Sequence, residues 1–451
     1  MVAVSHPTPR PVPPAVRDLS ERGQDEAVEI CRALLRIDSS NYGDGSGPGE
    51  RRAAEYAAGL LTDVGLDVQV LEAAPRRTTL VTRIEGADRT RPGLLVHGHL
   101  DVVPAAAADW QVDPFSGEER DGCLWGRGAV DMKDMDAMML ASVRELVRDG
   151  VRPARDVVIA FVADEEAGGD IGGRWLVQNH PALFDGVSEA VSEVGGFSVD
   201  LNGRRAYLLQ TGEKGMAWLR LVAHGRAGHG SMIHEDNAVT RLAAAVARIG
   251  AHPWPLEITP TVKAFLAGVE EITGVPLDPS DPDALVATLG TTARFVGATL
   301  RHTANPTALQ AGYKHNVIPG TATALVDARF LPGREEELMR TIHELAGDGV
   351  EIETAAHGVA LETEFSGALV DTMVASLQHE DPGAAVLPYL LSAGTDNKHF
   401  SALGIRGFGF VPLRLPAGLD FAGMFHGVDE RVPVESLRFG ARVLHRFLQT
   451  A

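Results

Sequence analysis

Seven acidic and imidazole side chains, all expected at strand ends or in loops, are the residues of this chain best suited to chemistry. They are His99, Asp101, Asp131, Glu165, Glu166, Glu193 and His426. Carboxylate oxygens and imidazole nitrogens are ligands that Zn²⁺ and similar ions accept. A site with two metal ions needs such a set, because one carboxylate bridges the ions and another stays free to carry a proton. The set therefore indicates a dinuclear metal site.

Each of these residues also has a simpler interpretation. His99 and Asp101 follow an apolar run, and an acid two residues beyond a histidine can fix its tautomer, but a His-x-Asp pair alone is a weak signal. His97 competes for the ligand role because it shares a strand face with His99. It lacks an acid two residues on, so we interpret it as structural. Asp131 precedes a predicted helix, where an acid is commonly only an N-cap.

The pair Glu165-Glu166 is the strongest local signal. It follows the buried strand predicted at 157–162. Adjacent carboxylates in such a place repel each other and are costly to desolvate, unless the turn is simply exposed. The conflict is relieved if one carboxylate binds a metal ion while the other accepts a proton from the attacking water.

The predicted elements place these side chains in an α/β domain. Continuous apolar strands separated by helices are typical of a buried, mostly parallel sheet. Before residue 213 we predict helices at 21–36, 50–64 and 132–148 and strands at 66–70, 94–96 and 157–162. After about residue 365 the same rhythm resumes with strands near 386–391 and 405–411 and a helix at 433–449.

A different pattern occupies the middle of the chain. Strands at 216–223, near 308–312, at 321–330 and at 350–354, with helices at 237–249 and 335–345, approximate the β-α-β-β-α-β order of a ferredoxin-like module. The segment 252–300 is not assigned to any element. We therefore predict a flexible arm at 1–18, a catalytic domain formed by 19–212 and 365–451, and an inserted domain at 213–364.

Composition limits the classes of partner. The chain has 451 residues and a net charge of −20, so nucleic acid and anionic membrane surfaces would repel it. No apolar run is long enough for a signal peptide or a membrane span, so we expect a cytoplasmic enzyme.

Cys31 and Cys123 form no CxxC motif and do not support a thiolate metal site. The absence of a Gly-x-Ser-x-Gly elbow and of a P-loop disfavours a serine hydrolase and a nucleotide-binding enzyme.

Several motifs together resemble those of the M20 metallopeptidases, a family of carboxypeptidases, dipeptidases, aminoacylases and desuccinylase-type deacylases. The resemblance covers nearly the whole chain after about residue 20. The motifs are Gly98–Pro104, Asp131–Lys133, Glu165-Glu166, Gly228–Ser231, Asn316–Pro319 and Gly394–Asp396. The resemblance implies a dinuclear zinc catalytic domain with an inserted ferredoxin-like lid and dimerisation domain.

The resemblance also implies a role for each candidate residue. His99 and Glu193 would bind one metal ion, Glu166 and His426 would bind the other, Asp131 would bridge the two, Asp101 would orient His99, and Glu165 would be the general base. In the inserted module, His229 would reach the active site of a partner subunit and stabilise the oxyanion. Asn316 would hold the oxyanion or the substrate backbone, and Arg329 would grip a substrate carboxylate with its planar guanidinium. Otherwise His229 is a solvated loop residue and Arg329 an ordinary surface ion pair.

Two departures from the family pattern leave alternative residues for two of the metal-ligand positions. Asp134 stands where many members have glycine, and Val194 separates Glu193 from the glycines that often follow this ligand directly. Glu189 is therefore a rival to Glu193. His399 is a rival to His426, although its place in a predicted helix favours a structural role.

The expected reaction is metal-assisted hydrolysis of an amide or peptide bond in a small substrate with a free carboxylate. The resemblance implies two divalent ions, Zn²⁺ first with Co²⁺ or Mn²⁺ as alternatives, and a homodimer formed through the lid domain. We expect a dipeptidase or carboxypeptidase-like enzyme, with an N-acyl-amino-acid deacylase as the alternative. A non-catalytic metal-binding protein on the same fold is the alternative from another class, which the intact Glu165 disfavours.

Overall fold

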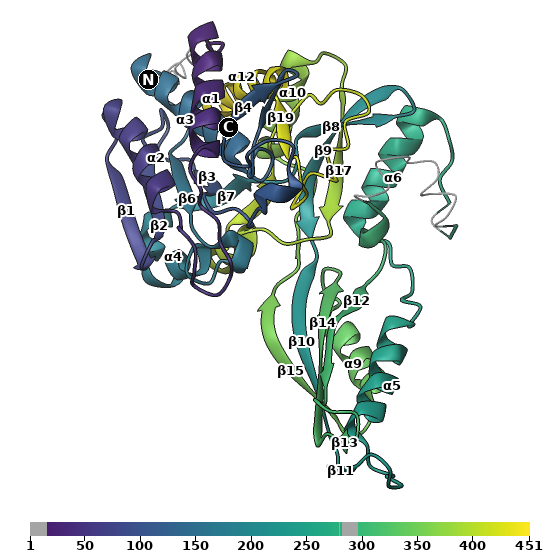
Figure 1. Ribbon diagram of the computed structural model, residues 1–451. Helices are drawn as coiled ribbons and strands as arrows, with labels where there is room; N and C mark the ends of the chain where they lie inside the picture. The colour runs from purple at the N-terminus through teal and green to yellow at the C-terminus, as the bar shows by residue number, and fades with distance from the viewer. Residues whose placement is uncertain (1–15, 279, 282–295) are drawn as a thin grey trace, which may run out of the picture.

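The computed structural model describes residues 16–278, 280–281 and 296–451. A large α/β domain carries both ends of the described chain, and a smaller domain extends from it (Figure 1). The strands of the large sheet are β1 (Val68–Ala74), β2 (Arg77–Ile84), β3 (Gly93–His99), β6 (Val157–Val162), β7 (Val187–Ser192), β8 (Phe197–Leu201), β9 (Arg204–Glu213), β16 (Leu361–Glu362), β17 (Ala385–Leu391) and β18 (Arg406–Gly409). They run in the order β1-β2-β6-β3-β7-β18-β9-β16, with β8 and β17 also paired to β9.

The centre of this sheet is parallel. Strand β3 lies between β6 and β7 and is parallel to both, and β18 continues the parallel pairing beyond β7. Antiparallel strands flank this centre, with β1 and β2 on one side and β8 and β16 against β9 on the other. Strands β3 and β6 are buried along their whole length, which explains their continuous apolar sequences.

Helices cover both faces of the large sheet. One face packs against α1, α3 and α12 in the main hydrophobic core, and the other packs against α4 and α11 around Leu176 and Phe400. The helices of this domain are α1 (Glu21–Leu35), α2 (Arg51–Asp63), α3 (Lys133–Arg148), α4 (Gly173–Asn179), α10 (Ala368–Glu380), α11 (Asn397–Phe400) and α12 (Val434–Thr450). A separate three-stranded sheet contains β4 (Glu118–Arg120), β5 (Cys123–Trp125) and β19 (Arg431–Pro433).

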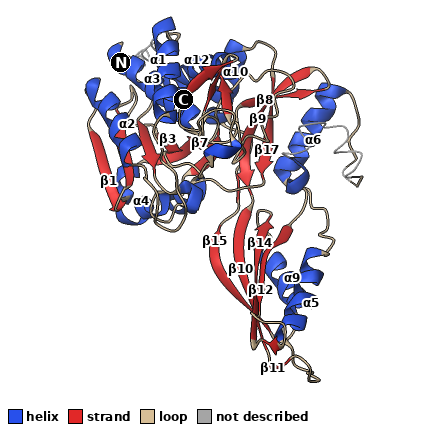
Figure 2. Ribbon diagram, viewed as in Figure 1, coloured by secondary structure: helices blue, strands red, loops and turns tan. Residues whose placement is uncertain are grey.

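The small domain has the expected β-α-β-β-α-β order. Its antiparallel sheet runs β12-β14-β10-β15, and α5 and α9 lie on one side of it (Figure 2). The elements are β10 (Gly215–His224), α5 (Ala238–Gly250), β12 (Thr303–Ala311), β14 (Thr321–Phe330), α9 (Glu335–Ala346) and β15 (Val350–Gly358), with β11 (Gly228–His229) and β13 (Val317–Ile318) paired at the far tip. The expected fold class, an α/β domain with an inserted ferredoxin-like module, is confirmed.

Part of the unassigned segment 252–300 returns to the large domain. Helix α6 (Pro260–Thr273) buries Val262, Phe265 and Val269 in the core of the large domain, against β17 and β9. Residues 279 and 282–295 lie outside the described part of the chain. The domain limits at 19–212, 213–364 and 365–451 stay a prediction.

In the described ranges, no helix combines the length and the hydrophobicity that crossing a bilayer requires.

Candidate active site

The candidate residues gather where the parallel strands end. His99 is the last residue of β3, Glu165 and Glu166 lie three and four residues after β6, and Glu193 directly follows β7. Because these three strands are parallel neighbours, their carboxyl ends share one edge of the sheet. That edge is where ligands bind in open α/β sheets. The predicted convergence of these side chains is what the structure shows.

Asp131 lies between two histidines. Its Oδ1 atom is 3.1 Å from Nε2 of His99, and its Oδ2 atom is 3.3 Å from Nε2 of His426. Each histidine also faces a second carboxylate, at 3.5 Å from Glu193 Oε2 to His99 and 3.0 Å from Glu166 Oε2 to His426. The two oxygens of one carboxylate thus each face a separate His–Glu pair, which is the arrangement of a bridging ligand.

The tautomer of His99 is set by the backbone. Its Nδ1 atom lies 2.9 Å from the carbonyl oxygen of Asp101, while the carboxylate of Asp101 is 3.7 Å away. An Nδ1–H that donates to this carbonyl leaves Nε2 free as a metal ligand. The carboxylate of Asp101 instead accepts hydrogen bonds from the backbone N–H groups of Glu165 at 3.1 Å and Glu166 at 3.2 Å. Asp101 therefore positions both His99 and the Glu165-Glu166 turn.

Glu165 is the candidate base. Burial raises the pKa of its carboxyl, although Lys398 partly opposes that effect. The Lys398 ammonium is its ion-pair partner, with Nζ 3.8 Å from Oε1. Glu165 also belongs, with His99 and Glu193, to a group whose ligand atoms lie within 4.8 Å of one another. It is thus close to the metal-ligand set without sharing the His–Asp131–His contacts.

The charges of the cluster fit divalent cations. Burial raises the pKa of Glu166 and of Glu193 to about 8. Hydrogen bonds to Asp131 and Glu166 raise the pKa of His426 to about 11. A protonated imidazole here balances the crowded carboxylates, and a divalent cation supplies the same positive charge while using the imidazole nitrogen as a ligand. The donor set of carboxylates and imidazoles suits ions of the Zn²⁺ class.

The buried Glu430 shapes the loop that carries Asp131, and our reading of the sequence missed it. Its Oε1 atom accepts from the N–H groups of Val130 at 2.7 Å and Asp131 at 3.2 Å. Its Oε2 atom accepts from the N–H of Gly128 at 2.9 Å and from Arg127 Nη1 at 2.7 Å. The only hint in the sequence is an acid four residues after His426.

The rival residues have other partners. Glu189 forms ion pairs with Arg155 and Arg406 near the start of β7. The ring of His97 contacts Asn397 Oδ1 at 3.0 Å and Ser192 Oγ at 3.2 Å, so it is part of a buried polar network. The Nε2 atom of His399 lies 3.0 Å from the Gly168 carbonyl and braces the turn after Glu166.

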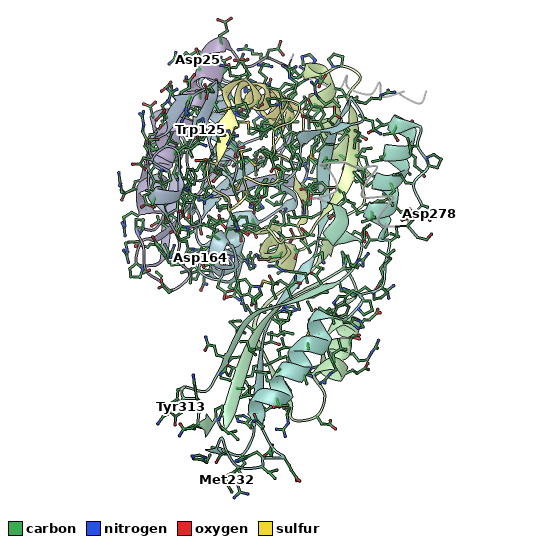
Figure 3. The ribbon with its side chains drawn as sticks, turned by 45° about the vertical axis from the view of Figure 1, so that its right-hand side comes forward. Asp25, Trp125, Asp164, Met232, Asp278 and Tyr313 are labelled. Atoms are coloured by element: carbon green, nitrogen blue, oxygen red, sulfur yellow. The ribbon has the colours of Figure 1, made fainter. Side chains whose placement is uncertain are left out.

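Two of the residues predicted in the small domain lie at its tip. His229 is in β11 and Asn316 directly precedes β13, and the tip is marked by Met232 and Tyr313 in Figure 3, far from the large domain. Within one chain the structure does not bring His229 or Asn316 to the cluster. Arg329 lies at the other end of β14, where its guanidinium contacts both carboxylate oxygens of Asp327 at 2.7 and 3.2 Å.

A third group of possible metal ligands contains Glu257, His302 and Glu337. The N–H of Leu331 donates to His302 Nδ1 at 3.2 Å, so the neutral imidazole carries its proton on Nε2. The Nε2 atom lies 3.6 Å from Glu257 Oε1, which is too far for a hydrogen bond. The group therefore lacks a free imidazole nitrogen and is not a metal site.

Comparison with known proteins identifies the family. The model of peptidase family M20/M25/M40 matches residues 95–450. The chain belongs to this family. Human aminoacylase-1 is 28% identical over 95% of this chain and 97% of its own length.

Solved structures agree on the fold. An M20 family metallo-carboxypeptidase from Sulfolobus solfataricus matches with a TM-score of 0.73 and 18% identity, covering 94% of this chain and 99% of its own. A Bacillus subtilis protein described as a dinuclear metal-binding peptidase of the M20 family matches with a TM-score of 0.58 and 12% identity, covering 96% and 100% of the two chains. With the family match over residues 95–450, the protein is an M20 family hydrolase of amide or peptide bonds.

Proposed function

We propose that this family member is a dinuclear-metal hydrolase that cleaves the amide or peptide bond of a small substrate with a free carboxylate. The main support for this function is the position of Asp131 between His99 and His426. The carboxylate of Glu165, which we do not assign as a ligand, lies near His99. His99, Glu193 and Asp131 would hold one ion, and His426, Glu166 and Asp131 the other. Zn²⁺ is the first choice, with Co²⁺ and Mn²⁺ as alternatives.

When bound, such ions polarise the scissile carbonyl and acidify the attacking water. Glu165 would take the proton of that water and pass it to the leaving amine. Its burial supports this role, because a raised pKa brings a carboxylate closer to the pH at which it must both accept and donate. Asp101 would keep the Glu165 backbone in place.

Two substrate classes, small peptides and N-acyl amino acids, are candidates. A dipeptidase or carboxypeptidase-like activity is our first candidate. The 28% identity to human aminoacylase-1 over nearly the full length favours an N-acyl-amino-acid deacylase as the second. A panel of dipeptides and N-acyl amino acids, assayed with Zn²⁺, Mn²⁺ and Co²⁺, decides between them.

The Glu165→Gln variant tests the chemistry directly. We expect turnover to disappear while bound metal stays near two ions per chain, because Glu165 is not a proposed ligand. Wild-type turnover in this variant would remove Glu165 from the reaction. Hydrolysis of neither substrate class by the metal-loaded wild type would contradict the proposed function.

We also propose that His229 and Asn316 act in a homodimer, from the small-domain tip of the partner subunit. Their distance from the cluster within one chain supports this arrangement (Figure 3). Mixing Glu165→Ala and His229→Ala subunits should then restore part of the activity, because each mixed dimer contains one site with both residues intact. No recovery after verified subunit exchange would show that His229 does not act across the interface. A cytoplasmic location remains part of the proposal.

A further inference from the structure

Lys398 is a buried cation beside the candidate base. It belongs to the short helix α11, and only 12% of its side chain is exposed. Burial alone would lower the pKa of Lys398, but the carboxylates of Glu165, Asp396 and Glu213 outweigh that effect and raise it. The side chain is therefore an ammonium at neutral pH.

The Lys398 ammonium has unused hydrogen-bonding capacity. Its contact with Glu165 Oε1 is 3.8 Å long, which is too far for a hydrogen bond. Among the described residues, Glu165 is the ion-pair partner of Nζ and no residue accepts a hydrogen bond from it. Three N–H donors on a mostly buried cation are costly to leave unpaired unless they face water or a ligand.

Lys398 lines a cleft of about 430 Å³ between the two domains. One wall is the turn after Glu165-Glu166, including Gly168. The other wall is formed by Met216, Trp218 and Gly358 of the small domain. The stem of Lys398 passes close to the small domain, since a Cβ placed on Gly358 would lie 3.6 Å from Lys398 Cδ. Lys398 thus lines this cleft and also lies 3.8 Å from the candidate base Glu165, which is not itself a lining residue.

The second cation that lines this cleft has a different setting. Arg174 is about half exposed and forms an ion pair with Asp170 at 3.0 Å. Arg329, which the resemblance assigns to a substrate carboxylate, is already bound by both oxygens of Asp327. Lys398 therefore combines burial, unused donors and closeness to Glu165.

We propose that Lys398 binds the free carboxylate of the substrate and so fixes the leaving amine next to Glu165. This inference rests on the proposed function. In a dipeptide or an N-acyl amino acid, the amine that leaves and the carboxylate are attached to the same α-carbon. Binding of the carboxylate to Lys398 consequently brings that amine close to the neighbouring Glu165, which is the residue that must protonate it. The proposal assigns to Lys398 the role that sequence resemblance gives to Arg329.

The test compares each substrate with its neutral amide. Lys398→Met, Lys398→Arg, Arg329→Met and Arg174→Met variants are assayed on an N-acyl amino acid and on the corresponding N-acyl amino acid amide. Lys398→Met should raise KM for the acid by about 10- to 100-fold, which is the loss of one charge-assisted hydrogen bond. The ratio of kcat/KM for the acid to kcat/KM for the amide should fall by a similar factor, because losing the ion pair with Glu165 affects both substrates while losing the carboxylate contact affects only the acid. Lys398→Arg should recover part of the preference for the acid, and Arg174→Met, the matched cation in the same cleft, should keep it.

A binding measurement separates this proposal from the proposed function. Calorimetry follows the binding of a free amino acid and of its amide to the metal-loaded protein and to the Lys398→Met variant. The variant should lose affinity for the acid alone, whether or not the wild type hydrolyses the panel. Equal losses for acid and amide would overturn the proposal and make Lys398 a counter-charge for Glu165. Selective loss in Arg329→Met with none in Lys398→Met would return the role to Arg329.

Discussion

Removing Glu430 tests whether its hydrogen bonds to the loop before α3 hold Asp131 in position. The Glu430 carboxylate accepts four hydrogen bonds, three from the backbone of residues 128–131 and one from Arg127. The Arg127 guanidinium also donates to the carbonyl of Gly427, the residue after His426, at 2.7 Å. Glu430 therefore ties the Asp131 loop to the His426 loop.

The magnitude follows from the burial of this group. Both Arg127 and Glu430 are almost completely buried. Removing one partner of a buried ion pair costs about 3–5 kcal/mol, because the other charge is left uncompensated. We expect the free energy of unfolding to fall by about that amount in Glu430→Ala. Because Asp131 would no longer be held between the histidines, metal affinity should fall by about 10- to 100-fold.

The assay is urea unfolding combined with metal titration. Both are measured for Glu430→Ala and for Glu430→Gln, which keeps the shape and one acceptor and should be intermediate. Glu435→Ala is the control, since Glu435 pairs with Arg438 on the surface with 78% of its side chain exposed, and the change should stay within about 0.5 kcal/mol. Unchanged metal affinity in a folded Glu430→Ala protein would refute the positioning role.

Two further predictions concern other buried groups. Asp101→Asn leaves one backbone N–H of the Glu165-Glu166 turn without an acceptor. We expect the free energy of unfolding to fall by about 1–3 kcal/mol and kcat/KM to fall at least tenfold. Unchanged kinetics would show that the turn keeps its conformation without Asp101. Burial lowers the pKa of His302 from 6.5 to about 4, so below pH 6.5 the unfolded state binds the extra proton and the folded protein loses stability as the pH falls. His302→Gln should remove up to about 1.4 kcal/mol of that loss per pH unit between pH 6.5 and 4, and identical pH slopes in urea unfolding of the two proteins would contradict the assignment.

Strand ends were the part of the site that the sequence predicted best. The apolar runs of β3 and β6 indicate buried parallel strands, and the residues after such strands must meet at one edge of the sheet. That rule places His99, Glu165 and Glu166 together without any knowledge of the rest. Asp131 and His426 lie in loops, and the prediction of their ligand roles depended on the family resemblance.

Contacts between distant segments could not be read from the sequence. Glu430 is 299 residues from Asp131, whose N–H it accepts, and no local pattern reports such a bond. The stabilising contact of His99 Nδ1 is with the backbone carbonyl of Asp101, whereas the sequence suggested its carboxylate. Helix α6 begins with a Thr259 cap and a proline, a readable start signal, but its packing on β17 is set by tertiary contacts.

The number of metal ions that each chain binds shows whether Asp131 bridges a dinuclear centre. Wild-type protein, Asp131→Ala and Glu189→Gln are saturated with Zn²⁺, freed of excess by gel filtration, and analysed by plasma mass spectrometry against protein concentration. We predict two ions per chain in the wild type and in Glu189→Gln, and fewer than one in Asp131→Ala. One ion or none in the wild type, or two ions retained without Asp131, would contradict a centre bridged by that carboxylate.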